Sequence, residues 1–150
     1  MSVNNKRVFY VKYLAHPIYT EILKARPDVR LDRLENETPE SGFAPVLSAA
    51  HAYQVGAARD EIAPHFHVHD ELIKRAPNLL IVSSNGAGFD PVDVDACTRA
   101  GVLVVNQSGG NANSVAEHAL GMLLTLSKRI LEADRAAPGS RRQPQCLDRQ

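Results

Sequence analysis

The apolar residues of this chain fall in short runs separated by longer segments at helical spacing. Two runs of four, Leu79–Val82 and Val102–Val105, are bounded by turn residues, as in strands buried on both faces of a parallel sheet. Weaker runs at Val8–Val11, Val29–Leu34 and Ala52–Val55 predict three more strands. The second of these alternates apolar and charged residues, which is typical of a half-exposed edge strand. We therefore expect a five-stranded sheet.

Segments at helical spacing lie between these runs, at residues 16–26, 43–51, 68–75 and 90–100. In the last of them, Asp90 is expected as the N-cap and Pro91 at the first helical position, with Gly101 as a left-handed terminator. Alternating strands and helices predict an α/β domain with a parallel sheet. Right-handed crossovers favour a flavodoxin-like, three-layer αβα fold with strand order 2-1-3-4-5.

A long protruding helix is predicted from Ser114 to about Asp134. Ser114 and Glu117 stand at the spacing of a capping box, in which each side chain covers a free backbone amide. Apolar residues lie almost all round this segment, including Leu120 and Leu124, which predicts burial on every side.

The expected organisation is therefore a sheet domain over 1–112, a helix over 113–134 and a tail over 135–150. The tail has almost no bulky apolar residue and is expected to be disordered.

Three motifs carry a family resemblance: Asn85–Asp93, Ala100–Asn106 and Gly110–His118. In this order and at this spacing they resemble the D-isomer-specific 2-hydroxyacid dehydrogenases, which include phosphoglycerate, glyoxylate and hydroxypyruvate reductases. The match is clear over residues 77–134. It implies the flavodoxin-like substrate domain of an NAD- or NADP-dependent oxidoreductase that acts on the CH–OH group of 2-hydroxy acids.

The loop Asn85-Gly86-Ala87-Gly88 follows the carboxyl end of a predicted parallel strand, where open α/β sheets bind ligands. Glycines let backbone amides approach an anion closely. The resemblance implies that this loop binds the substrate carboxylate, with the Ala87 and Gly88 amides as donors. It also implies that Ala87 and Val115 border the cofactor. Without the resemblance, the residues alone favour a tight turn that binds no ligand.

The resemblance also shows what these 150 residues do not contain. No Gly-x-Gly-x-x-Gly occurs, so the family's Rossmann cofactor domain is not represented. The family's catalytic arginine, glutamate and histidine belong to that part as well, so no catalytic residue is predicted. The pair Glu117-His118 is not a substitute, because the capping box accounts for the glutamate. We expect a truncated chain, with an out-of-frame tail, that is inactive alone, and whether it is an enzyme stays open.

Composition narrows the function further. Lys plus Arg and Asp plus Glu number 17 each, so nothing indicates nucleic acid or a membrane surface as a partner. No long apolar run or signal peptide occurs, which predicts a cytoplasmic protein. Cys97 and Cys146 make no disulfide framework, and Cys97 is expected in the core.

Histidines alternate at His65, His67 and His69 and on a strand could all face one zinc ion. An exposed polar loop is the favoured interpretation, so no metal is predicted.

Two alternatives come from other classes of protein. The chain could be an interaction module that forms a homodimer, or pairs with a full-length relative, through residues 114–133. A receiver domain of the response-regulator kind shares the strand order, but it needs acidic residues at the ends of the first and third strands. Those ends carry Lys12 and Gln54 instead, which argues against it.

Overall fold

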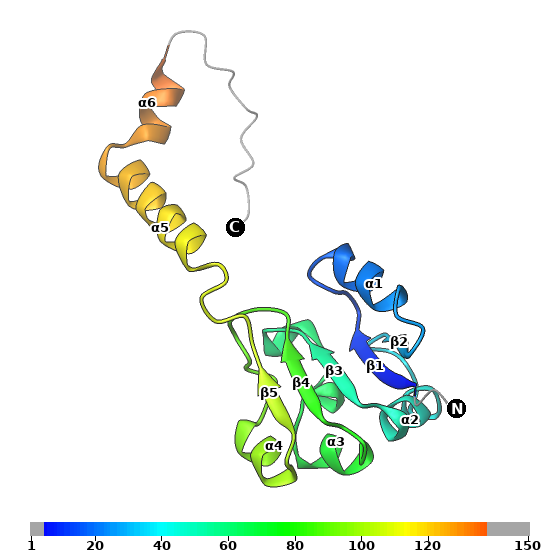
Figure 1. Ribbon diagram of the computed structural model, residues 1–150. Coiled ribbons are helices and arrows are strands. Elements are labelled where there is room, and N and C mark those ends of the chain that lie inside the picture. Colours follow the sequence, from blue (N-terminus) through cyan, green and yellow to red (C-terminus); the bar gives the residue numbers. More distant parts are fainter. Residues whose placement is uncertain (1–4, 138–150) are drawn as a thin grey trace. The chain divides into compact units, whose positions relative to one another are not determined.

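The computed structural model describes residues 5–137, which belong to two compact units, 1–110 and 111–150. The first unit is a five-stranded, all-parallel sheet in the order β2-β1-β3-β4-β5, with helices on both faces (Figure 1). The predicted fold class is confirmed. Its elements are β1 (Lys6–Val11), α1 (Pro17–Lys24), β2 (Val29–Leu34), α2 (Glu40–Ala49), β3 (Ala52–Val55), η1 (Arg59–Glu61), η2 (Pro64–Phe66), α3 (Asp70–Arg75), β4 (Ile81–Ser84), α4 (Val94–Ala100) and β5 (Leu103–Val105).

The core lies between the central strands and the helices α2, α3 and α4. Phe9 of β1 stacks on Tyr53 of β3 with ring centroids 4.1 Å apart, and Val82 of β4 is fully buried beside them. The Tyr53 hydroxyl donates to the Phe66 carbonyl at 3.1 Å, and burial raises the pKa of Tyr53. These buried contacts hold the carboxyl ends of β1, β3 and β4 in fixed register, which is where ligands bind in such sheets.

The two four-residue apolar runs are less buried than their composition predicts. β4 begins only at Ile81, and Leu80 before it is 56% exposed. In β5, Leu103 and Val105 are exposed and only Val104 packs against the core. The expectation of burial on both faces was wrong for β5, because this strand is the edge of the sheet.

The start of α4 also differs from the expectation. Asp90 is not the N-cap; Asp93 is, and its carboxylate accepts a hydrogen bond of 2.9 Å from the Ala96 amide. Pro91 instead flanks an isolated parallel bridge between Val68 and Val92. Its carbonyl accepts from the Val68 amide at 2.8 Å, and the Asp93 amide donates to the Val68 carbonyl at 2.9 Å. This long-range pairing keeps residues 91–92 out of the helix.

The second unit contains α5 (Ala112–Ser127) and α6 (Ile130–Ala136) rather than one continuous helix. Arg129 adopts a left-handed backbone conformation, φ 51°, and interrupts the helical hydrogen bonds there. Ser114 is not a cap, because α5 already begins after Asn111, which makes no side-chain cap bond. The long helix is therefore present in part, over 112–127. The disorder expected for the tail, and Cys146 with it, lies outside the described residues apart from 135–137.

None of the helices within residues 5–137 combines the length and the apolarity required to span a bilayer. Cys97 is fully buried on α4, as expected for a core residue, and burial followed by the nearby Asp93 charge raises the pKa of its thiol.

Candidate functional site

Residues 85–88, the glycine loop, follow directly from the carboxyl end of β4. The Asn85 amide donates to the Val55 carbonyl at 2.9 Å, which continues the pairing of β4 with β3 by one residue. Farther along, the Asp90 amide donates to the Ala57 carbonyl at 3.3 Å. The loop therefore lies beside the segment that leaves β3, at the edge of the sheet expected to bind ligands.

One buried hydroxyl braces the glycine loop from within. Ser84 is the last residue of β4 and only 1% exposed. Its Oγ donates to the Gly88 carbonyl and accepts from the Gly86 amide at 3.3 Å. A single side chain thus joins the two glycines and holds the turn closed between them.

The loop carbonyls are held by the segment that follows β5. The Gln107 amide donates to the Gly86 carbonyl at 3.0 Å, and the Asn106 Nδ2 donates to the Ala87 carbonyl at 2.9 Å. The carbonyl groups of Gly86 and Ala87 are therefore occupied, and the N–H groups of the loop remain to be considered. In the described part of the chain, the N–H groups of Ala87 and Gly88 have no intramolecular acceptor, and both residues are exposed. The loop therefore presents two adjacent free amide donors to solvent.

Asn85 is oriented from beneath by Gln54 of β3. Gln54 is 4% exposed, and its Nε2 donates to the Asn85 Oδ1 at 2.8 Å. This bond leaves the Asn85 Nδ2 as a further donor at the loop. The Gln54 Oε1 is buried and has no hydrogen-bond partner among the described residues. A buried acceptor without a donor destabilises the fold, so Gln54 does not stabilise the core. Its hydrogen bond to Asn85 in the glycine loop is the better explanation for a glutamine at this position.

Both glycines of the loop pack closely against Ala57. A Cβ at Gly88 would lie 3.2 Å from the Ala57 carbonyl oxygen, and a Cβ at Gly86 would lie 3.2 Å from the Ala57 methyl group. A side chain at either position would push the loop away from the end of β3. Close approach to Ala57 therefore favours glycine at both positions, and backbone conformation does not, since neither glycine has a positive φ.

The predicted site residues divide between the two units. Asn85, Gly86, Ala87 and Gly88 form one continuous loop in the first unit, whereas Val115 is exposed on α5 of the second unit. Ser84, Gln54 and Asn106 were missed by reasoning from the sequence. Each is a polar residue at or near the end of an apolar strand, which is the signal that could have identified them.

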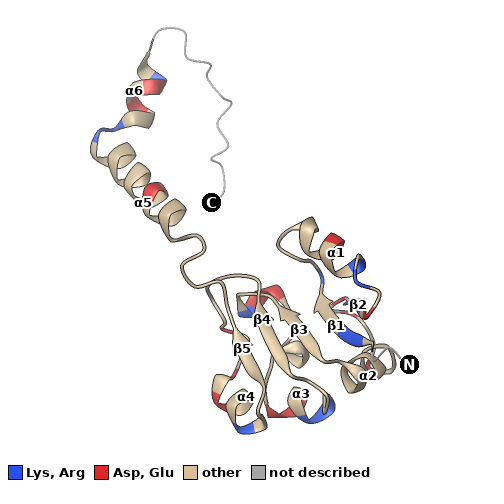
Figure 2. Cartoon of the chain, viewed as in Figure 1, with Lys and Arg blue, Asp and Glu red and all other residues tan. Residues whose placement is uncertain are grey.

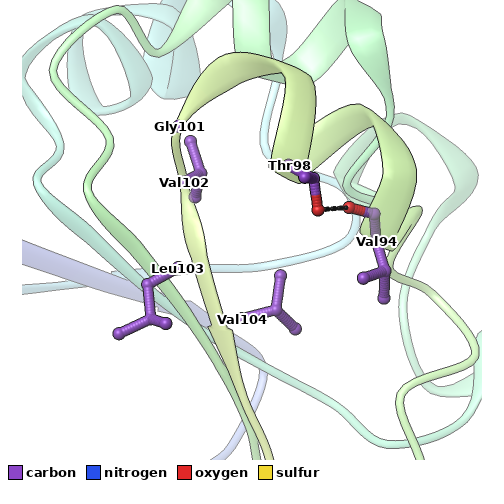
Figure 3. A pocket seen from close by; sticks show the side chains of 6 residues that line it. All are labelled: Val94, Thr98, Gly101, Val102, Leu103 and Val104. Carbon is purple, nitrogen blue, oxygen red and sulfur yellow. Dashed lines mark hydrogen bonds between the residues drawn. The ribbon is translucent and has the colours of Figure 1, made fainter.

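An apolar hollow of about 440 Å³ lies elsewhere, between α4 and β5 (Figure 3). It is lined by Val94, Thr98, Gly101, Val102, Leu103 and Val104. Its one hydroxyl, that of Thr98, already donates to the Val94 carbonyl at 2.8 Å. No lining side chain is left to recognise a charged ligand, so this hollow is not a site for an acid.

The histidines do not form a metal site. His65 lies in η2 and stacks on Phe43 with centroids 5.3 Å apart, while the His67 Nε2 contacts the Arg59 carbonyl at 3.1 Å. They lie on a 3-10 turn and the residues after it, so they do not alternate along a strand. Within residues 5–137, no three His, Cys, Asp or Glu side chains are grouped to hold a metal ion.

Comparison with known proteins places this loop in a family context. The model of the D-isomer specific 2-hydroxyacid dehydrogenase catalytic domain matches residues 14–139. D-3-phosphoglycerate dehydrogenase of Mycobacterium leprae is 54% identical over 67 residues, which are 45% of this chain and 13% of that protein. The enzyme of the same name from Archaeoglobus fulgidus is 44% identical over 69 residues, 46% of this chain and 13% of its own length.

Among solved structures, D-lactate dehydrogenase from Aquifex aeolicus, complexed with NAD and lactic acid, is similar with a TM-score of 0.64 and 26% identity. That likeness covers 92% of this chain and 39% of the dehydrogenase. The chain thus corresponds to well under half the length of each of these relatives.

Proposed function

Because this chain belongs to the D-isomer specific 2-hydroxyacid dehydrogenases, we propose that its glycine loop binds the carboxylate of a 2-hydroxy or 2-oxo acid. The observation that carries the proposal is the pair of free N–H groups at Ala87 and Gly88. A carboxylate is an acceptor of two parallel hydrogen bonds, and adjacent backbone amides match that geometry. In this role the chain is the substrate domain of an oxidoreductase.

Hydrogen bonds from the surrounding residues hold the peptide groups of the loop in place. Ser84 closes the turn, and Asn106 occupies the Ala87 carbonyl, so the peptide cannot rotate without breaking hydrogen bonds. Gln54 holds Asn85 with its Nδ2 available to a ligand oxygen. Donors fixed before the ligand arrives need little ordering on binding.

The affinity of the loop alone can be bounded. A hydrogen bond to a charged group contributes about 1.5–3 kcal/mol, so two of them contribute roughly 3–6 kcal/mol. A dissociation constant of about 1 mM corresponds to about 4.1 kcal/mol. We therefore expect millimolar binding of small 2-hydroxy acids by the 150-residue chain.

The hydride in this family is carried by NAD or NADP, and those groups supply the redox chemistry when bound. The residues of this chain do not fit such a cofactor on their own. The glycine loop and the residues after it read Gly86-Ala87-Gly88-Phe89-Asp90-Pro91, with proline where the cofactor motif has its third glycine, and no other segment of the sequence has that motif. We expect the 150-residue chain to bind no NADH in calorimetry and to reduce neither glyoxylate nor hydroxypyruvate.

The test of acid binding uses two ligands that differ in one group. Saturation-transfer NMR should detect glycolate bound to the chain and should detect little or no glycolamide, which lacks the carboxylate. Equal transfer to both ligands would contradict carboxylate recognition.

A second candidate function rests on the surface of the second unit. Apart from Glu117, α5 carries no charged residue (Figure 2), and several of its large apolar side chains are exposed. The most exposed is Leu126, at 76%. Burying one such side chain contributes roughly 1.5–3 kcal/mol. An isologous dimer formed through α5, or pairing with a longer relative, would cover these side chains.

Sedimentation equilibrium tests this second function. The chain should be a dimer at tens of micromolar, and Leu120→Glu and Leu124→Glu should make it a monomer. His118→Glu adds the same charge at an exposed polar position of the same helix and should leave the dimer intact. A wild-type monomer at that concentration would remove this candidate.

A further inference from the structure

A second hollow, of about 300 Å³, lies at the carboxyl end of β1. We call it the β1 hollow; its polar lining consists of Tyr10, Lys12, Tyr13, His16, Thr20 and Arg33. These residues come from the end of β1, the start of α1 and β2. The hollow is separate from the glycine loop, because β3 lies between β1 and β4 in the sheet. With strands about 4.7–4.9 Å apart, the two places lie roughly 10 Å apart across the sheet.

The lysine in this hollow occupies a strained turn. The Tyr13 amide donates to the Val11 carbonyl at 2.9 Å across Lys12, whose φ is 63°. This is a γ-turn with a left-handed central residue, which is rare and strained for any residue with a Cβ. Glycine would adopt it at lower cost. Backbone strain of this kind is found mainly where a side chain serves a function.

The two cationic side chains of the hollow differ in their pairing. Among the described residues, Lys12 makes no ion pair, whereas Arg33 pairs with Glu35 at 2.8 Å. The His16 Nδ1 accepts from the Ile18 amide at 3.2 Å, so its Nε2 is left to donate. Acidic side chains also reach the lining at Tyr13, whose pKa is raised by a hydrogen bond with Glu61, then by burial and by the charges of Glu61 and Asp60.

We propose that the β1 hollow binds a phosphate-type oxyanion, with Lys12 as the cation and His16, Tyr10 and Thr20 as hydrogen-bond donors. Donors from two different elements around one concave surface match an anion with at least three acceptor oxygens better than they match a flat carboxylate. The phosphoryl group belongs either to the acid held by the glycine loop, in which case the inference rests on the proposed function, or to a separate molecule.

Inorganic phosphate is the first probe, titrated into the 15N-labelled chain while amide signals are followed. Saturable shifts are expected at Lys12, Tyr13, Leu14 and Thr20. Lys12→Gly and Lys12→Gln should each weaken the affinity at least tenfold. Lys24→Gln removes a lysine from the exposed end of α1, outside the hollow, and should change the affinity less than twofold.

Lys12→Gly also separates binding from folding, since glycine relieves the strained turn and should not lower the melting temperature. Lys12→Gln retains the β-carbon and the strain, so it reports the loss of charge alone. Absence of saturable shifts, or equal phosphate affinity in wild type and Lys12→Gln, would overturn the proposal.

Two acids distinguish the source of the phosphoryl group. If 3-phosphoglycerate shifts the hollow and the Ala87–Gly88 amides with one dissociation constant, a single acid spans both places. If it shifts the hollow alone and no more tightly than inorganic phosphate, the oxyanion belongs to a separate molecule. D-glycerate should shift only the glycine loop. Its failure to do so would contradict the proposed function while leaving the β1 hollow intact.

Discussion

Removing the Ser84 hydroxyl should loosen the glycine loop and weaken acid binding together. Ser84→Ala deletes both hydrogen bonds that join Gly86 to Gly88. A net hydrogen bond contributes about 0.5–1.5 kcal/mol, so two of them contribute about 1–3 kcal/mol to folding. The Gly88 carbonyl also loses its hydrogen-bond donor, so this peptide group becomes freer to rotate. We expect a loss of 1.4 kcal/mol or so in binding free energy, about tenfold in affinity.

Ser83→Ala is the matched control for this change. Ser83 is the preceding residue of the same strand, is half-buried, and makes no side-chain hydrogen bond among the described residues. The same chemical group is deleted, from a side chain that points to the other face of the sheet. Urea unfolding should therefore show a much smaller loss of stability for Ser83→Ala, and glycolate binding should be unchanged.

Ser84→Ala and Ser83→Ala should differ in both stability and glycolate affinity. Equal urea midpoints for Ser84→Ala and Ser83→Ala would show that the Ser84 hydroxyl does not brace the turn. Equal glycolate affinity in Ser84→Ala and wild type would show that the amides are aimed by other contacts.

Three further substitutions test the packing of Gly88, the ion pairs of Asp32 and the hydrogen bond of the Tyr53 hydroxyl. Gly88→Ala should weaken acid binding, because its Cβ would lie 3.2 Å from a carbonyl oxygen and displace the loop, whereas Gly121→Ala on α5 has open space and should leave binding unchanged. Desolvation raises the pKa of Asp32, but hydrogen bonds and charge from Arg7 and then Arg30 lower it further, so the folded pKa lies below its usual value. The ionised Asp32 carboxylate therefore contributes stability that is present above about pH 4 and is lost as the pH falls through the lowered pKa. Asp32→Asn should lower the melting temperature at pH 7 and should reduce the fall of the melting temperature between neutral and acid pH. Tyr53→Phe should cost about 1–3 kcal/mol in urea unfolding, since it leaves a buried carbonyl without a donor, and an unchanged midpoint would contradict the contact.

Local chemistry predicted most of the sheet domain. The strand order follows from the alternation of strand and helix patterns along the sequence and from the right-handed crossover between parallel strands. The strand Ala52–Val55 has the predicted bounds. Gly101 ends α4 with φ 71°, as its position at the end of a helical segment indicates. Such features depend on neighbours in the sequence, which is why sequence alone could identify them.

The failures have long-range causes. Asp90 and Asp93 are equally good caps by residue type, and only the pairing of Val68 with residues 91–93 decides between them. The exposure of Leu103 follows from the edge position of β5, which its apolar composition does not reveal. No glycine or proline lies at Arg129, so nothing in the sequence indicates that the helix is interrupted there. At the candidate site, the sequence predicts the position of the glycine loop after β4, but the side chains of Gln54 and Asn106 that hold the loop come from other strands or follow them.

Acid binding depends on the free amides of Ala87 and Gly88, and one titration observes both amides. The 15N-labelled chain is titrated with glyoxylate, and the amide shift of every assigned residue is followed. The largest saturable shifts are expected at Ala87 and Gly88, with Asn85 next, and they should fit a dissociation constant of about 1 mM. Shifts that are absent at these two amides, or that are larger elsewhere in the chain, would contradict acid binding by the glycine loop.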